Sequence, residues 1–283
     1  MIEFEEITSI PSFSNQLKNK ILYSNHSEDI SVSYKSTYTI KYVIDGLKHY
    51  NLDRQDIEVS KSQYLILNHD SLITTEAKKG TKGLSLFLST KLINEISHFY
   101  SNGNSSIKFL EVIQTSSDQK VKKLLDKIIY LYKNNKIALK QKKDDLFIAI
   151  SELVVQEQIA IDNNFTRLKI VKHDTKRELY NSITKAKEYL NDNFKEKISL
   201  DQISRDIGIS KYYLHRLFRE INGNTPLEYL KSIRLEEAKN KLQYSKDPIF
   251  EIAFKCGFDS TSYFSNMFKK HTGFSPTQFR KTL

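Results

Sequence analysis

Residues 200–218 read LDQISRDIGISKYYLHRLF, and residues 249–268 read IFEIAFKCGFDSTSYFSNMF. The two runs are copies of one pattern, offset by 49 residues in their first halves and by 50 in their second halves. The matching positions are Leu200 with Ile249, Ile203 with Ile252, Gly208 with Gly257, Leu214 with Phe264, Phe218 with Phe268, Gly223 with Gly273 and Pro226 with Pro276. One such pattern also occurs in ordinary helical hairpins, but two aligned copies predict two helix-turn-helix units, which are suited to reading DNA.

The turn of each copy carries the residue types that a tight turn between helices requires. Gly208 and Gly257 stand where the chain leaves the first helix, and a positive φ is expected there. Ser210 in the first copy, and Ser260 or Asp259 in the second, are natural N-caps for the helix that follows. Each unit is therefore predicted to hold a short helix, a tight turn and a second helix.

The second helix of each unit is expected to have an apolar inner face and a polar outer face. The predicted core residues are Leu214, Leu217 and Phe218 in the first unit and Tyr263, Phe264, Met267 and Phe268 in the second. The predicted outward residues are Lys211, Tyr212, His215, Arg216 and Arg219 in the first unit and Thr261, Ser262, Ser265, Asn266, Lys269 and Lys270 in the second. These residue types suit base edges and phosphates. The candidates for contacts to the DNA backbone are Lys211, Arg219, Lys269 and Lys270.

The distribution of charge agrees with a polyanionic partner. The chain of 283 residues has a net charge of +10. Residues 177–283 contain 19 Lys and Arg against 13 Asp and Glu, and the other 176 residues contain 25 against 21. The charge density is therefore more than twice as high in the segment with the doubled pattern. Residues 120–143 hold nine Lys against one Asp, for which a solvated helix face is favoured over a contact with DNA.

The first hundred residues are expected to form a β barrel or sandwich. Short segments rich in β-branched and aromatic residues are separated by breaks that contain Gly, Asp or Asn. The predicted strands are Ser31–Tyr34, Tyr38–Asp45, Gln63–Leu67 and Gly83–Ser89. The aromatic residues of this region are expected mainly to pack in its core, with a ligand pocket as the alternative.

After Ser89 the apolar residues recur at the spacing of an α-helix. The predicted helices are Lys91–Tyr100, Gln119–Asn134, Asp144–Ile161, one around Ile183–Phe194, and Thr225–Gln243, which would link the two helix-turn-helix units. The second and third form a hairpin, joined by a turn that contains Lys136, Lys140, Lys142 and Lys143. Residues 162–176 are polar and lack an apolar period, which indicates a linker.

These segments predict an α+β chain with two domains. Residues 1–161 would be a regulatory and dimerisation domain, with the β barrel in 1–100 and helices in 101–161. Residues 177–283 would be an all-α DNA-binding domain after the linker. The apolar faces of the helical hairpin exceed what a small barrel needs to cover itself. Leu125 and Ile129 are therefore predicted to lie in the contact of a homodimer.

Residues 252–276 also fit a more specific pattern. They contain Ile252-Ala-x-x-x-Gly-Phe-x-x-x-Ser-Tyr-Phe-x-x-x-Phe-Lys-Lys-x-x-Gly-x-Ser-Pro. This run resembles the signature of AraC/XylS-family transcription regulators, and Arg234 and Ala238 on the predicted linking helix fit the family pattern as well. The close match extends over about residues 183–281.

The resemblance implies a function and a set of contact residues. The base-reading positions would be Tyr212, His215, Arg216, Thr261, Ser262, Ser265 and Asn266. Asn266 stands where a longer basic or amide side chain is common in the family. Family members usually carry a sensing domain, often a cupin-like barrel followed by dimerising helices, ahead of the DNA-binding module. The resemblance therefore implies double-stranded DNA as a partner, a small-molecule effector and a homodimer.

The sequence gives little support for a metal site, an enzyme or a bound cofactor. His26, His49, His69 and His98 are isolated, which argues against a metal site and favours surface or loop positions. The chain has neither a Gly-rich phosphate loop nor a Gly-x-Ser-x-Gly motif, so neither an enzyme nor a cofactor is expected. The single cysteine, Cys256, is expected to be a small buried hydrophobe.

A cytoplasmic protein is predicted, because no segment has the composition of a signal peptide or a membrane span. The function that the sequence favours is sequence-specific DNA binding in the regulation of transcription, responsive to an effector. The alternative is a non-catalytic ligand-binding or interaction protein that regulates no promoter.

Overall fold

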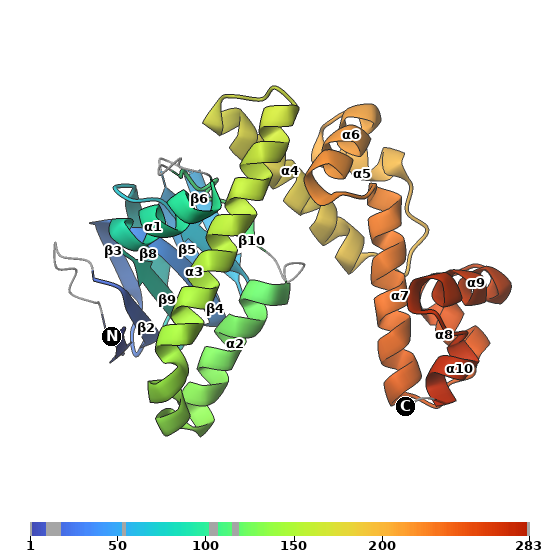
Figure 1. Cartoon of the computed structure of the whole chain (residues 1–283), viewed down its shortest axis with the longest axis horizontal. Coiled ribbons are helices and arrows are strands. Elements are labelled where there is room, and N and C mark those ends of the chain that lie inside the picture. The colour runs from blue at the N-terminus through green and yellow to red at the C-terminus, as the bar shows by residue number, and fades with distance from the viewer. Residues whose placement is uncertain (1, 10–17, 53–54, 102–106, 115–118, 282–283) are drawn as a thin grey trace. The chain divides into compact units, whose positions relative to one another are not determined.

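The computed structural model describes residues 2–9, 18–52, 55–101, 107–114 and 119–281. The chain forms two compact units, one that extends to Asn181 and one that begins at Ser182 (Figure 1). The first unit combines two β-sheets with helices, and the second is entirely helical among its described residues. The expected α+β class with a C-terminal helix-turn-helix domain is confirmed. No helix in the described parts of the chain is long and apolar enough to cross a membrane.

Two sheets face each other in the first unit. The six-stranded sheet has the order β1 (Glu3–Ile7), β2 (Lys20–Asn25), β9 (Lys82–Leu88), β4 (Tyr38–Asp45), β7 (Tyr64–Leu67) and β10 (Ile113–Gln114). The four-stranded sheet has the order β3 (Ile30–Lys35), β8 (Leu72–Ala77), β5 (Leu47–Leu52) and β6 (Gln55–Ser60). β1 and β2 pair in parallel, and the other pairs are antiparallel. The four strands predicted from sequence are present, and six further strands complete the sandwich.

The central strands of the six-stranded sheet are buried on both faces. On β4, Ile40 and Tyr42 belong to the apolar cluster beneath the helices, whereas Val43 belongs to the cluster between the sheets. Because side chains alternate along a strand, Thr39 and Lys41 point between the sheets with Val43. This double burial explains why apolar residues of β4 occur on both of its faces.

Three helices cover the outer face of the six-stranded sheet. They are α1 (Thr90–Tyr100), α2 (Gln119–Asn134) and α3 (Lys136–Arg167) (Figure 1). The expected hairpin of α2 and α3 is present, but its turn is shorter than predicted. Only Asn135 separates the two helices, and its side chain caps α3 by accepting a hydrogen bond from the Ala138 N–H. The lysines assigned to a turn therefore lie in the first turns of α3, where their stems tolerate a helical backbone.

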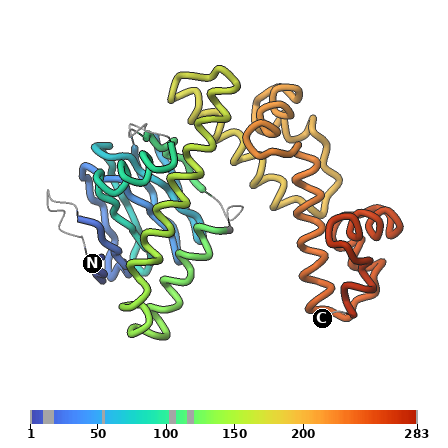
Figure 2. Tube along the Cα trace, viewed as in Figure 1, coloured from blue at the N-terminus to red at the C-terminus, as the bar shows by residue number. Residues whose placement is uncertain are grey.

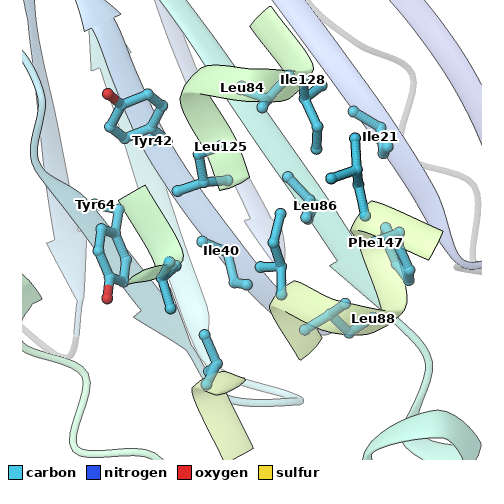
Figure 3. Packing of buried hydrophobic residues seen from close by; sticks show 14 of the residues in the cluster. Ile21, Ile40, Tyr42, Tyr64, Leu84, Leu86, Leu88, Leu125, Ile128 and Phe147 are labelled. Atoms are coloured by element: carbon cyan, nitrogen blue, oxygen red, sulfur yellow. The ribbon is translucent and has the colours of Figure 1, made fainter. Parts of the chain in front are cut away.

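The structure corrects the role predicted for Leu125 and Ile129. Both side chains are buried within a single chain, with exposed fractions of 0% and 7%. Figure 3 shows Leu125 packed among residues of the sheet that include Ile40 and Leu84. The apolar faces of the hairpin are used to cover the sheet, because its outer face is as apolar as its inner one. The two residues are therefore not available as the contact between two copies.

The stretch 162–176 contains more regular structure than a linker was expected to have. α3 continues to Arg167, and α4 (His173–Asp192) begins six residues later. Phe165 is fully buried and anchors the end of α3, while the Lys176 ammonium pairs with the Asp162 carboxylate. One buried ring and one ion pair thus order a segment whose composition is otherwise polar. The division between the two compact units falls within α4.

The second unit is built around one long helix. Its elements after α4 are α5 (Leu200–Ile207), α6 (Lys211–Asn222), α7 (Pro226–Tyr244), α8 (Ile249–Lys255), α9 (Thr261–Thr272) and α10 (Pro276–Lys281). Figure 2 shows α7 extending from α6 at one end to α8 and α10 at the other. The predicted linking helix is confirmed, with Thr225 as its N-cap and Pro226 at its first position, where a missing N–H costs nothing.

Candidate nucleic-acid interface

The first helix-turn-helix unit is fixed by local hydrogen bonds. The Ser199 side chain accepts from the Gln202 N–H, and the Gln202 side chain accepts from the Ser199 N–H, which forms a capping box at the start of α5. Gly208 ends α5 with a φ of 78°, as the sequence predicted. The Ser210 Oγ then accepts from the Tyr213 N–H and caps α6. The Ser199 and Ser210 caps, together with the left-handed backbone conformation of Gly208, thus set the start and direction of α6.

α6 has the two faces that its sequence predicts. Leu214, Leu217 and Phe218 are buried, and the Phe218 ring packs on the Tyr229 ring of α7 with 5.6 Å between centroids. The residues left on the surface include Tyr212, His215, Arg216 and Arg219. Tyr212 is 79% exposed. The outer face of α6 therefore offers an aromatic ring, an imidazole and two guanidinium groups to a partner.

Lys211 differs from the other cations of α6 because it already has a partner. Its Nζ lies 3.1 Å from the Asp201 Oδ1 on α5 and 5.6 Å from the centre of the Tyr212 ring. The hydrogen bond with Asp201 raises the pKa of Lys211 above its ordinary value. A contact between Lys211 and a phosphate would have to share or replace this ion pair.

The second unit repeats the turn and the cap of the first. Gly257 follows α8 with a φ of 80°, and the Ser260 Oγ accepts from the Tyr263 N–H at the start of α9. Ser260, not Asp259, is therefore the N-cap. Cys256 is fully buried between these helices, and burial raises the pKa of its thiol to about 11. The prediction that Cys256 acts as a small buried hydrophobe is confirmed.

The outer face of α9 is more aromatic than predicted. Phe264 and Phe268 are fully buried and Met267 packs partly buried against the same cluster, as expected, but Tyr263 is 47% exposed. Its ring lies 6.4 Å from the Phe258 ring, so one edge contacts the core while the rest remains at the surface. The assignment of Tyr263 to the core was wrong, because a helical period cannot tell a residue at the margin of an apolar face from one at its centre.

The predicted contact residues of α9 fall into two groups by exposure. Ser262, Asn266, Lys269 and Lys270 are exposed, and Thr261 and Ser265 are half-buried. The exposed amide and hydroxyl lie on the first two turns, whereas Lys269 and Lys270 lie on the last turn. The structure thus brings Ser262 and Asn266 to one face at i, i+4 spacing, with the two cations further along the helix.

Sequence reasoning also missed Tyr213, which is half-exposed on α6 beside Tyr212. The signal for both tyrosines was available, since Tyr213 and Tyr263 occupy equivalent places one residue before a buried Leu214 or Phe264. Each amide is held by the capping serine of its unit. The two units therefore present a tyrosine at the same position of their second helix.

α7 joins the two units and belongs to the core of both. Leu230 is buried near the first unit, while Leu235, Ala238 and Leu242 pack with α8, α9 and α10. The chain enters α7 through a capping box of Thr225 and Glu228. The equivalent residues of the second copy, Ser275 and Gln278, exchange the same bonds at the start of α10. The second helix of each unit is thus followed by the same kind of joint, which leads from α6 into α7 and from α9 into α10.

The histidines and acidic residues are the possible metal ligands of the chain. The described residues contain no group of three or more His, Cys, Asp and Glu that could hold a metal ion. His49, His69 and His98 are exposed, as expected. His26 was expected at the surface but is buried, because it continues β2 into the space between the sheets.

Comparison with known proteins agrees with this geometry. Residues 203–282 match the family described as a helix-turn-helix domain. The chain is 37% identical over 93 residues to the HTH-type transcriptional activator RhaS of Escherichia fergusonii, which covers 33% of this chain and 34% of that protein. It is also 37% identical over 94 residues to the bifunctional transcriptional activator/DNA repair enzyme AdaA of Bacillus subtilis, covering 33% of this chain and 44% of that protein. The chain thus matches less than half the length of these relatives.

Among solved structures, the C-terminal domain of AraT, a response regulator from Geobacillus stearothermophilus, is similar with 33% sequence identity. The similarity covers 36% of this chain and 85% of that domain, with a TM-score of 0.35.

Proposed function

We propose that this chain, in which residues 203–282 are a helix-turn-helix domain of the AraC/XylS type, regulates transcription by binding double-stranded DNA of a specific sequence. The observation that carries the proposal is the repeated unit itself. Two helices, α6 and α9, have buried apolar faces, exposed polar faces and matching caps, and both are attached to α7. A helix of this diameter fits the major groove.

Within this proposal the residues of the two helices have different tasks. Tyr212, His215 and Arg216 on α6, and Thr261, Ser262, Ser265 and Asn266 on α9, read base edges. Arg219, Lys269 and Lys270 are exposed cations that bind phosphates, and Lys211 joins them when its bond to Asp201 is shared. Arg216 is the strongest candidate for base reading, because a guanidinium can donate two parallel hydrogen bonds to guanine and no described residue pairs with it.

The length of α7 suggests how the two helices are spaced. A helix of 19 residues is about 28 Å long at about 1.5 Å per residue. Successive major-groove segments on one face of DNA are about 34 Å apart. A single copy of the chain could therefore place α6 and α9 in neighbouring segments of the groove.

The proposal assigns regulation and assembly to the first unit. It acts as a sensing and dimerising domain, without catalysis, and the protein works in the cytoplasm where its DNA is. Because Leu125 and Ile129 lie in the core, a contact between two copies would use the outer surface of α2 and α3. Ile148 of α3 lies on that surface and is partly exposed. Two linked copies would gain affinity for paired DNA sites through effective concentration.

A footprint of the full chain on its bound DNA tests the proposal. Genomic fragments that the protein retains are sequenced, and the recovered site is probed for protection in the major groove. Two protected patches about 10 base pairs apart are expected for each copy of the protein. A single patch, or equal retention of all fragments in the presence of competitor DNA, would contradict the proposal.

A further inference from the structure

One face of α2 carries a row of exposed lysines. Lys120, Lys123 and Lys127 are spaced by three and four residues, so they lie on one side of the helix together with Tyr130. All four residues are exposed, and the exposed fraction of Tyr130 is 64%. We refer to these four residues as the α2 stripe. The stripe presents three ammonium groups and one phenol at the surface of the first unit.

The opposite face of α2 holds the stripe in place. Val121, Leu125 and Ile128 are fully buried and belong to the apolar cluster that joins α2 to the six-stranded sheet. Figure 3 shows Leu125 and Ile128 among residues of the sheet such as Leu84. Because the helix is packed along its apolar face, the three lysine stems project from a rigid base, and a partner need not order the backbone.

The lysines of the stripe lack a counter-charge among the described residues. Asp126 is the only acidic residue of α2, and both of its carboxylate oxygens are engaged. Its Oδ2 lies 2.6 Å from the Lys122 Nζ, and its Oδ1 accepts a hydrogen bond of 2.6 Å from the Tyr42 hydroxyl. Within the described parts of the chain, no carboxylate forms an ion pair with the three lysines of the stripe. The stripe therefore has free positive charge for an external anion.

Folding does not account for this arrangement. Like charges at i, i+4 spacing destabilise a helix, and Lys123 and Lys127 have this spacing. A face that serves only for solvation usually mixes both signs of charge, and elsewhere in the first unit Lys20 and Lys78 pair with carboxylates at 2.8 Å. The exposed lysines that continue the positive surface around the turn into α3 are Lys133, Lys136, Lys140 and Lys142. A bound polyanion would offset the repulsion along this helix.

We propose that the α2 stripe binds the phosphate backbone of the DNA that flanks the site read by α6 and α9. The inference rests on the proposed function, which brings DNA to this chain. Each DNA strand carries one charge per about 3.4 Å of axis, and Lys120 and Lys127 are about 10 Å apart along α2 at about 1.5 Å per residue. Three flexible stems over this length can each reach a separate phosphate, and the Tyr130 hydroxyl can donate to another phosphate oxygen.

The chemistry of the stripe favours DNA over other anionic partners. A helix that lies on a membrane needs a broad apolar face, whereas the only apolar surface of the stripe is the Tyr130 ring. A two-fold contact of two copies at the stripe would bring equivalent positive charges together, and like charges repel. A contact between copies is therefore expected on α3, where Ile148 is partly exposed. Once α6 and α9 hold a DNA site, the adjacent duplex is at a high effective concentration, so a few phosphate contacts suffice.

Binding of the full chain to long DNA fragments at several salt concentrations tests the proposal. The stripe variant carries Lys120→Gln, Lys123→Gln and Lys127→Gln, which remove three charges, while glutamine keeps a helix propensity close to that of lysine. We expect at least about tenfold weaker binding at low salt, to specific and random DNA alike, and a salt dependence smaller by about three counter-ions. Unchanged affinity and salt dependence in this variant would overturn the proposal.

A matched control removes three charges elsewhere on the first unit. It carries Lys35→Gln, Lys79→Gln and Lys91→Gln, all at exposed positions, and Lys35 lies on β3 in the four-stranded sheet. The control should keep the salt dependence of the wild type. An equal loss in the control would show that net charge, and not the stripe, is what DNA senses, which would also overturn the proposal.

A DNA-cleaving probe attached to the stripe locates the contact without removing its lysines. The single cysteine, Cys256, is buried, so Tyr130→Cys supplies an exposed thiol for an iron chelate that cuts the nearby DNA backbone. We expect cuts outside the two patches protected by α6 and α9 for Tyr130→Cys, and none for the control Lys35→Cys. The absence of cuts from Tyr130→Cys, or the same cuts from both positions, would contradict a contact at the stripe.

The remaining outcomes separate this proposal from the proposed function. A chain that prefers no sequence, but whose stripe variant loses affinity for random DNA, would contradict the proposed function and support the stripe. A chain that binds its specific site equally well with and without the stripe would contradict the stripe alone. With DNA binding unchanged, loss of binding to phosphatidylserine vesicles would assign the stripe to a membrane, and a change from dimer to monomer in light scattering would assign it to a second copy. Either result would overturn the contact with DNA.

Discussion

The Arg234 Nε donates a hydrogen bond of 2.7 Å to the carbonyl oxygen of Phe194, and a second guanidinium nitrogen donates to the Glu196 carbonyl at 2.7 Å. Arg234 lies in the middle of α7, while Phe194 and Glu196 belong to the segment between α4 and α5. The same guanidinium lies 5.9 Å from the centre of the Phe258 ring in the second helix-turn-helix unit. One side chain therefore ties the linking helix to both halves of the second unit.

This junction explains why the two turn glycines are not equivalent. A Cβ at Gly257 would lie 2.8 Å from the Phe194 carbonyl oxygen and 2.9 Å from the Arg234 Nε, whereas a Cβ at Gly208 would meet no atom within 4 Å. Both residues have a positive φ. Gly208 is needed only for its backbone conformation, but Gly257 is needed for conformation and space.

Replacing each glycine with alanine should therefore give different losses of stability. Gly208→Ala is expected to lower the free energy of unfolding by about 1–2 kcal/mol, the cost of a left-handed non-glycine residue. Gly257→Ala should lower it by about 2–5 kcal/mol, because close packing adds to that cost. Urea denaturation followed by helical circular dichroism measures both. Equal losses would show that the close approach of Gly257 to Arg234 adds nothing to the free energy of unfolding.

Arg216 and Lys269 should differ in how they affect DNA binding. Arg216→Ala is expected to cost about 1–3 kcal/mol on the specific site and to relax the preference at one base pair, with little change on random DNA. Lys269→Ala should weaken binding to both kinds of DNA and reduce the salt dependence by about one counter-ion. Mobility shifts at several salt concentrations distinguish the two profiles. If the profiles coincided, the division between base reading and phosphate contact would be wrong.

The ion pair between Lys211 and Asp201 should restrain DNA binding. Asp201→Asn removes the negative charge that now holds the Lys211 ammonium, so Lys211 becomes free to bind a phosphate. We expect tighter binding to random and specific DNA alike, with a salt dependence steeper by about one counter-ion. The double variant Asp201→Asn, Lys211→Met should lose this gain. A gain that persists in the double variant would rule out Lys211 as its source.

Substitutions at Leu125 and Ile148 should distinguish an effect on the folding of the first unit from an effect on the assembly of two copies. Leu125→Glu buries a charge beneath the sheet, and a loss of stability of about 4 kcal/mol or more is expected whatever the oligomeric state. Ile148→Glu changes a partly exposed position on α3, so the chain should remain folded. If two copies meet on this surface, light scattering should report a monomer for Ile148→Glu and a dimer for the wild type. A wild type that is monomeric at micromolar concentration would contradict the homodimer.

The two buried lysines, Lys41 of β4 and Lys48 of β5, should make the free energy of unfolding increase with pH. Burial lowers the pKa of both to about 7 in the folded chain, below the ordinary 10.5. Above pH 7 the unfolded chain therefore holds more protons than the folded one, and the free energy of unfolding should increase with pH. We expect this increase between about pH 7 and about pH 8.5, below the range in which tyrosines and Cys256 titrate. The double variant Lys41→Met, Lys48→Met should be nearly independent of pH there, and Lys35→Met should behave as the wild type.

The buried His26 should also make the free energy of unfolding increase with pH, but in a lower range of pH. The folded pKa of His26 is about 4, below its ordinary value of 6.5, so protonation favours the unfolded chain as pH falls between these values. His26→Asn should reduce this loss. Chemical denaturation at closely spaced pH values measures both effects, and a stability that rises as pH falls through this window would contradict the burial of His26.

The C-terminal unit was largely determined by its sequence. Gly208, Ser210 and Ser260 act through bonds to residues at most four positions away, and such local rules can be seen directly in the order of amino acids. The duplication added a second, independent copy of each signal. Local patterns also identified α2, from apolar residues at helical spacing, and β4, from its β-branched and aromatic residues.

The tertiary structure decided what depends on distant partners. Strands such as β5 and β8 carry polar residues on an exposed face, and they become strands through pairing with each other. The apolar face of α2 predicted that Leu125 would be buried but not against which surface, since a sheet and a second chain exclude water equally well. Lys41 was hidden in the same way, because a lysine in a β-strand is expected to face water until a second sheet covers it. Local patterns specify the elements of this chain, while the partner that each face buries is set only when all elements compete for the same apolar surfaces.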